Sequence, residues 1–277
     1  MKKLFILAFA ALGMLACTEP NNPDNPSGDV VKDGALPGKF SIGNNKQIQF
    51  SQGNLQYQAS TNTWRFAEQQ CGIIGEANKN ISSSYSGWID LFCWNTSNNP
   101  LQLSSNYELD TVFTDWCKNK ISNGGNKAWL WRTLTPDEWD YLMDRSIDED
   151  GKEGLSFGGK VNGISGYIIL PDAWATPEGL VIDDDDDEIS YSQSEWQKMQ
   201  AAGAVFLPAA GDRSNEDNIE YVGTLGIYWL SHFVGSTWLS DAPHADAFGF
   251  ETTIGFTVDS QVECSMGCSV RLVKDVE

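Results

Sequence analysis

Short apolar runs bounded by glycine, asparagine or proline constrain this chain more than any other feature of its sequence. The runs 39–42 and 47–50 alternate polar and apolar residues on either side of Gly43-Asn44-Asn45, a pattern typical of two antiparallel strands joined by a turn. The runs 55–57 and 63–66 repeat the arrangement. Runs of this length favour short strands, so we expect them to supply much of the core.

Two segments predict helices instead. Thr135-Pro136-Asp137-Glu138 provides a capping hydroxyl, a proline at the first helical position and the glutamate of a capping box. Trp139 and Leu142 then fall on one face of a helix. A weaker helix is predicted over 194–202, with Trp196 and Met199 facing inward.

The remaining apolar runs predict further strands, and the polar stretches between them predict long loops. Residues 72–128 are rich in Ser, Asn and Gly with scattered aromatic rings, which indicates loops held to a core by those rings. The further runs are 167–170, 204–207, 226–230, 247–250 and 269–273. Few helices, many short strands and long loops predict an α+β fold.

Charge excludes one class of function. The 277 residues include 38 Asp and Glu against 18 Lys and Arg, for a formal net charge of −20. Such a chain repels phosphate backbones, so we expect no nucleic-acid partner. Aromatic residues make up 12% of the chain, with 11 tryptophans, which is enough for a sizeable core.

The N-terminus predicts export and lipidation. Lys2 and Lys3 precede an apolar stretch over 4–15, which is shorter than the roughly 20 residues of a membrane-spanning helix. Met14-Leu15-Ala16-Cys17 resembles a bacterial lipobox, with Met in place of the usual Leu. We therefore expect a signal peptide over 1–16, a lipidated Cys17 that anchors the chain to a membrane, and a Pro-rich tether over 17–38.

Residues 39–277 are then expected to form one domain, with a strand and loop part over 39–128 and a motif-bearing part over 129–277. The segment Trp131–Leu142 (WRTLTPDEWDYL) resembles the "WRLPTxxEWxYL" motif of the formylglycine-generating-enzyme-like branch of the C-type lectin fold. The segments 203–211 and 226–229 follow in that family's order, and Gly267–Val273 (GCSVRLV) resembles its closing strand. The chain resembles the Fibrobacter succinogenes major paralogous domain found in lipoproteins of Bacteroidales.

That resemblance implies a C-type lectin-like fold with short antiparallel strands, two helices and long loops, on an outer-membrane lipoprotein at the cell surface or on the periplasmic side. It also raises an alternative, because formylglycine-generating enzymes bind copper through two cysteines near the C-terminal end. Cys264 and Cys268 invite the comparison, but three residues separate them here instead of four, and Cys268 lies inside the closing motif. We expect a disulfide or two buried thiols, no catalytic residue and no enzyme activity.

Two other patterns suggest modification or metal binding. Six consecutive carboxylates over 183–188 predict a solvated loop, with loose calcium binding as the alternative; the ligands would be Asp183, Asp185, Asp187 and Glu188. The loop lacks the spacing of an EF-hand, and Trp94-Asn95-Thr96 departs from the Trp-Asn-Asp calcium motif of lectins, so we expect no required cofactor. Asp110-Thr111-Val112 resembles an acceptor motif for O-glycosylation at Thr111.

The segment 231–266 is the strongest candidate for ligand binding, because related proteins use this stretch as exposed loops. The residues expected to contact a ligand are His232, Phe233, Trp238, Asp241, His244 and Asp246. Aromatic rings among carboxylates suit a glycan or a protein surface. Ser231 and His232 with Asp241 or Asp246 could form a triad, but no nucleophile elbow is present and we expect both histidines to be loop residues.

The favoured hypothesis is a non-enzymatic binding protein of the cell envelope, an adhesin or a receptor for a glycan or protein ligand. A formylglycine-generating type of oxidase and a periplasmic structural lipoprotein are the alternatives.

Overall fold

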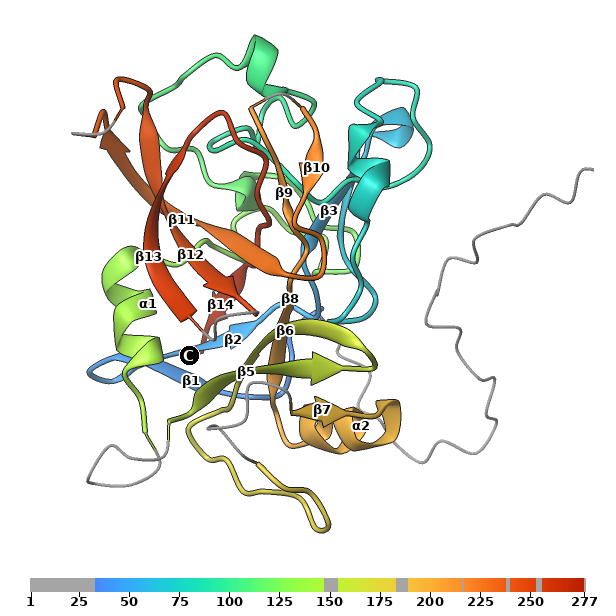
Figure 1. Ribbon diagram of the computed structural model, residues 1–277, viewed down its shortest axis with the longest axis vertical. Helices are drawn as coiled ribbons and strands as arrows, with labels where there is room; N and C mark the ends of the chain where they lie inside the picture. The colour runs from blue at the N-terminus through green and yellow to red at the C-terminus, as the bar shows by residue number, and fades with distance from the viewer. Residues whose placement is uncertain are drawn as a thin grey trace, which may run out of the picture.

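Short, mostly antiparallel strands and two α-helices form the described part of the protein (Figure 1). The computed structural model describes residues 33–146, 154–182, 189–215, 217–237, 240–252 and 256–276, with only the backbone of 256–259. The strands are β1 (Phe40–Gly43), β2 (Lys46–Phe50), β3 (Leu55–Gln58), β4 (Thr63–Phe66), β5 (Ser156–Val161), β6 (Ile164–Ile169), β7 (Ser190–Tyr191), β8 (Val205–Pro208), β9 (Asp212–Arg213), β10 (Ile219–Glu220), β11 (Leu225–Gly235), β12 (His244–Glu251), β13 (Phe256–Glu263) and β14 (Val273–Asp275). The helices are α1 (Pro136–Met143) and α2 (Gln193–Ala201), with 3-10 turns at Ala59–Thr61, Gly75–Lys79, Ser104–Asn106 and Trp116–Lys118.

The predicted α+β class is therefore confirmed. Five small sheets have the strand orders β1-β2-β14, β3-β4, β9-β10, β11-β12-β13 and β7-β5-β6-β8, and only the β5–β7 pair is parallel among the pairs described. In Figure 1, β5, β7 and α2 lie in the lower part of the view and β11 to β13 in the upper part, with α1 beside the latter.

Both predicted helices form where their caps indicate. Thr135 Oγ1 accepts a hydrogen bond from the Glu138 backbone N–H at 3.3 Å, and Glu138 accepts one from the Thr135 N–H at 3.1 Å. The second helix has the same capping box, formed by Ser192 and Glu195. Its residue Trp196 is buried as predicted. Neither helix in the described part has the length or the apolar character that crossing a bilayer requires.

The closing segment 267–273 connects parts of the chain that are far apart in sequence. It was predicted as one strand, but only Val273 belongs to β14, and the residues before it pair singly with several neighbours. Its bridges are Gly267 with Arg213, Cys268 with Phe92, Ser269 with Tyr228, and Val273 with Arg132, and the Leu55 and Ser51 N–H groups donate to its carbonyls. A segment shared in this way holds the strands around it without forming a continuous ladder.

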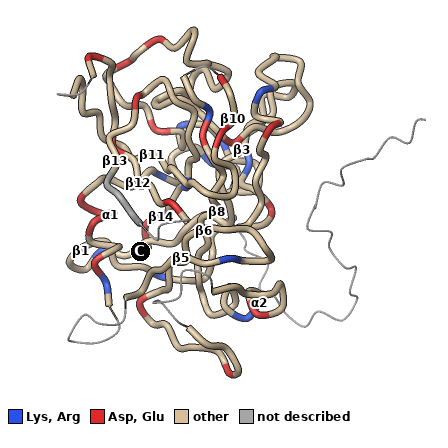
Figure 2. Tube along the Cα trace, in the orientation of Figure 1, with Lys and Arg blue, Asp and Glu red and all other residues tan. Residues whose placement is uncertain are grey.

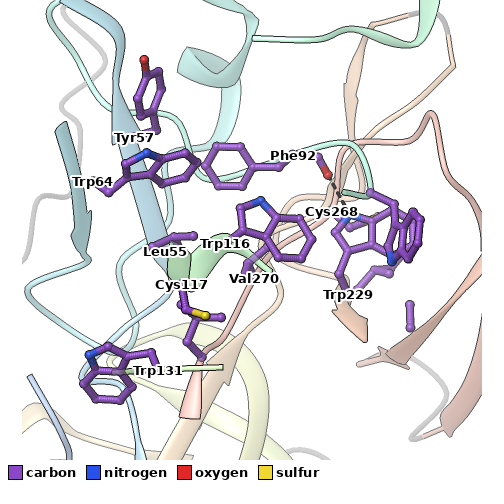
Figure 3. Close-up of a cluster of buried hydrophobic side chains, with 14 of the residues drawn as sticks. Leu55, Tyr57, Trp64, Phe92, Trp116, Cys117, Trp131, Trp229, Cys268 and Val270 are labelled. Carbon is purple, nitrogen blue, oxygen red and sulfur yellow. Dashed lines mark hydrogen bonds between the residues drawn. The ribbon is translucent and has the colours of Figure 1, made fainter. Parts of the chain in front are cut away.

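Aromatic side chains fill the core around this segment, as we predicted from the aromatic residues scattered over 72–128. Phe92, Trp94 and Trp116 are fully buried, and Figure 3 shows two of them beside Trp229. The Trp229 indole donates to the Phe92 carbonyl at 2.7 Å, the dashed contact in Figure 3. Buried indoles that find such partners hold long loops in place without regular secondary structure.

The predicted tether boundary is wrong at its C-terminal end. Leu36 is buried, its N–H donates to the Phe50 carbonyl at 2.8 Å, and Ala35 bridges Ser51. The Gln52 N–H also donates to the Gly34 carbonyl at 2.8 Å. The fold therefore includes residues that were assigned to the tether, because the backbone of 34–36 pairs with the chain around Ser51 and the Leu36 side chain is buried. The predicted signal peptide, Cys17 and the rest of the tether up to residue 32 lie outside the described residues.

Candidate functional site

An exposed imidazole and a half-buried carboxylate lie together on β11 and β12. His232 Nδ1 is 2.6 Å from Asp246 Oδ2, and the two side chains are 62% and 22% exposed. An imidazole N–H at Nδ1 can donate to this carboxylate oxygen, and the other ring nitrogen then stays available to a ligand. Gln261, also exposed, lies opposite Asp246 on β13. The three side chains offer donors and acceptors on one sheet.

A bulge in β11 places His232 at this position. Trp229 pairs with Ala247 and Phe233 pairs with Ala245. Between these two pairs β11 therefore covers four residue steps and β12 covers two, so β11 contains extra residues. The extra backbone groups are used elsewhere: the Trp94 indole donates to the Leu230 carbonyl at 3.0 Å, and the Ser231 N–H donates to the Leu134 carbonyl at 3.1 Å. Bulges reorient side chains in this way next to many binding sites.

The loop character predicted for 231–266 is largely wrong, because β11, β12 and β13 occupy most of it. Both histidines lie on strands, and His244 is opposite Gly235 with its Nδ1 atom 2.7 Å from the Ala242 carbonyl. A triad does not form around His232, since no serine hydroxyl of the described residues hydrogen-bonds to its ring. The β-branched and aromatic residues of this segment have the spacing of strands. The polar residues between them led to the prediction of loops instead.

The other predicted contact residues are dispersed. Phe233 is partly buried, and its ring centroid is 5.6 Å from that of Trp94. It therefore packs against the core of the protein. Asp241 is exposed in the turn that joins β11 and β12. Trp238 lies outside the described residues. Of the six predicted residues, the structure brings His232 and Asp246 into contact.

The two C-terminal cysteines are sealed in the core. Cys264 and Cys268 are both 0% exposed and both are free thiols, although a turn lies between them. Burial raises the pKa of the Cys264 thiol to about 12 and that of Cys268 well above its ordinary value. Metal binding and oxidation need thiolates, so these surroundings disfavour the chemistry of a formylglycine-generating type of oxidase. The second expected state, two buried thiols, is the one observed.

The remaining predicted sites have different outcomes. Asp183, Asp185, Asp187 and Glu188 lie outside the described residues, and within those described no three metal-type ligands cluster. Thr111 is exposed on a loop that Asn95 holds, with the Asn95 amide donating to the Asp110 and Val112 carbonyls at 2.9 Å. A hydroxyl in this position is accessible to a modifying enzyme.

An open groove of about 500 Å³ beside the C-terminal end of α1 is less promising. Its lining includes Arg145 and Asp172, whose Nη1 and Oδ1 atoms are 2.8 Å apart. Asp172 also accepts hydrogen bonds from Ser41 and Gln47, and Arg145 donates to the carbonyls of Leu142 and Leu170. These groups bind one another and join β1 to the chain after β6.

A buried polar network escaped the sequence analysis. Arg271 is 4% exposed and donates to the Gln70 side chain at 2.9 Å and to Asn54 at 3.3 Å. Asn54 in turn donates to the Tyr228 hydroxyl, which donates to the Pro208 carbonyl at 2.7 Å. Burial lowers the pKa of Arg271 to about 10. A charged residue within the apolar run Val270–Val273 was the available signal, and it was interpreted only as part of a family motif.

Asp90 and Arg213 are buried nearby and are incompletely bonded. Burial raises the pKa of Asp90 to about 6, although Asn78 donates to its Oδ1 atom at 2.9 Å. Asp90 Oδ2 and the Arg213 Nε and Nη1 atoms have no protein partner. Polar groups of this kind normally reach internal water. Their burial marks them as structural groups and not as a surface for a ligand.

Comparisons of the chain with protein-family models, with curated proteins and with solved structures found no significant match.

Proposed function

We propose that this chain is a non-enzymatic, lipid-anchored binding protein of the cell envelope, displayed at the surface as an adhesin or as a receptor for a glycan or protein. The observation that carries the proposal is the exposed His232–Asp246 pair at 2.6 Å, set by the β11 bulge beside the turn before β12. Binding sites use fixed donors and acceptors on a rigid scaffold, and the strands β11 and β12 supply such a scaffold for this pair.

The arrangement suits recognition better than catalysis. His232 presents one free ring nitrogen, Asp246 its second oxygen, and Gln261 an exposed amide within the same sheet. Such a set can exchange hydrogen bonds with the hydroxyls of a sugar or with the backbone of a protein loop. The lectin-like fold belongs to the same proposal, and the short antiparallel strands and two helices of the described part are consistent with it.

The first experiment is protease shaving of intact cells that express the full chain, with lysed cells as the control. Cleavage on intact cells would place the domain outside the cell. Protection until lysis would rule out the adhesin hypothesis and favour a periplasmic structural lipoprotein that co-purifies with other envelope proteins.

If the domain faces outward, the cells are screened against glycans and host proteins. The double variant His232→Ala with Asp246→Ala is expected to lose binding, while the exposed Glu178→Ala on a distant loop retains it. Equal binding by both variants would place the ligand site elsewhere.

A further inference from the structure

A closed loop over 117–129 differs in charge from the rest of the chain. The Trp129 N–H donates to the Cys117 carbonyl at 2.7 Å, and the Gly124 and Asn126 N–H groups both donate to Ile121 at 3.0 Å. The buried residues Trp116 and Trp131, both labelled in Figure 3, flank the loop in the sequence. The Trp131 indole donates to the Gly124 carbonyl at 2.8 Å. Backbone closure and these rings hold the loop in a defined shape.

Trp129 faces solvent from this loop. Trp129 is 67% exposed, and its backbone φ of 63° lies in the left-handed region. Bulky residues rarely adopt that conformation, and where they do, the surrounding structure imposes it. The loop therefore holds a large amphipathic ring in water at a conformational cost, which points to an interaction surface.

Positive charge is concentrated in the sequence of this loop. Between Asp115 and Asp137 the chain carries three lysines, one arginine and no carboxylate, although its net charge is −20. Arg132 is paired with Glu138 and Asp275. Lys118, Lys120 and Lys127 have no carboxylate of the described residues within ion-pair distance. Figure 2 shows acidic positions along much of the trace, whereas the sequence of this loop contains lysines and no carboxylate.

The tether leaves the fold at the same place. Asp33, the first described residue, lies beside the loop, because a Cβ atom added to Gly125 would be 3.5 Å from its carboxylate. Asp33 is 16 residues from Cys17, which extended chain spans in at most about 55 Å. A lipid on Cys17 would keep the loop within reach of the membrane surface.

We propose that the 117–129 loop docks the domain onto the anionic headgroups of the membrane that holds Cys17; this inference rests on the proposed lipid anchor. Lysine ammonium groups pair with headgroup phosphates, and a tryptophan ring sits at the boundary between headgroups and acyl chains. Carboxylates farther than about 8 Å from the surface are largely screened at physiological salt, so the local charge outweighs the net charge. The tether holds the loop at a high effective concentration near the membrane, so a contact that is weak by itself can still form.

The test uses the mature chain with Cys17→Ser, which separates docking from anchoring. Flotation with phosphatidylcholine vesicles that contain about one third phosphatidylglycerol is compared with flotation on phosphatidylcholine alone. The variant K118Q/K120Q/K127Q is expected to bind anionic vesicles on the order of 100-fold more weakly, at about fivefold for each lysine. The control K39Q/K46Q/K198Q removes the same charge from exposed positions elsewhere and is expected to bind as the parent does.

Salt dependence and Trp129→Phe complete the test, with weaker binding expected at high salt and in the variant. Absence of vesicle binding, or equal losses in the two triple variants, would overturn the proposal. Binding of the loop to an acidic polysaccharide such as polygalacturonate, without binding to vesicles, would also overturn it and assign the loop to a glycan. Lipidation of Cys17 is measured separately by mass spectrometry, so docking without lipidation would refute the anchor and leave the loop's membrane affinity standing.

Discussion

The His232–Asp246 pair and the Arg271 network use comparable polar groups in opposite surroundings. The first lies on the sheet surface, where His232 is 62% exposed, and the second lies in the core, where Arg271 is 4% exposed. Water screens the first pair and competes for its hydrogen bonds, whereas Arg271 depends on protein partners alone. The two clusters therefore differ in how much their hydrogen bonds can contribute to stability.

The largest effect is expected from Arg271→Ala. The substitution removes the donors to Gln70 and Asn54 and leaves their buried oxygens without those partners, so we expect a loss of about 3 kcal/mol or more in the free energy of unfolding. Urea titration measures the change. Lys79→Ala, which removes an exposed pair with Glu76, serves as control and is expected to cost less than about 1 kcal/mol. A comparable small loss for Arg271→Ala would contradict the structural role.

Asp90→Asn tests the cost of a buried carboxylate. Because burial raises the Asp90 pKa from 3.8 to about 6, the folded state binds a proton more tightly than the unfolded state. The stability that protonated Asp90 contributes is present at low pH and is lost as the pH rises from about 4 to about 6. It stays lost at higher pH. The variant should therefore gain about 2–3 kcal/mol relative to the parent between about pH 4 and about pH 8.

Urea titrations across that range measure the gain, and Glu178→Gln, at an exposed position, serves as control. A difference between Asp90→Asn and the parent that stays constant with pH would mean that Asp90 titrates normally in the folded protein.

Cys268→Ser separates a structural thiol from a reactive one. A serine hydroxyl at a position that is 0% exposed is harder to bury than a thiol, so we expect a loss of about 1–2 kcal/mol. The folded parent should resist alkylation at Cys264 and Cys268, and the urea-unfolded protein should react there, as mass spectrometry would detect. Rapid alkylation of either thiol in the folded protein, together with copper binding, would instead revive the oxidase alternative.

The smallest effect on stability is expected at the exposed pair. His232→Ala should change the free energy of unfolding by less than about 0.5 kcal/mol, since exposed pairs contribute little. Its effect should appear in ligand binding by whole cells. A stability loss above about 2 kcal/mol would make the pair part of the scaffold and remove the contrast with Arg271.

Local patterns predicted much of the secondary structure. The capping box at Thr135–Glu138, the hairpins over 39–66 and the run before Pro208 all form where expected, because each depends on neighbours in the chain. The β11 bulge could not be predicted, since it depends on the Trp94 indole and the Leu134 carbonyl, which arrive from elsewhere. The same holds for the attachment of Leu36 to Phe50.

The sequence by itself determined the α+β class, both helices and the acidic character of the chain, because periodicity, caps and charge are local or summed properties. Tertiary structure alone decided which polar groups meet water. It paired His232 with Asp246 at the surface and enclosed Cys268 and Arg271, although all four lie within a stretch of 40 residues, from 232 to 271. Solvent exposure depends on every segment packed around a residue, and the surroundings of one residue cannot be read from its neighbours in the chain.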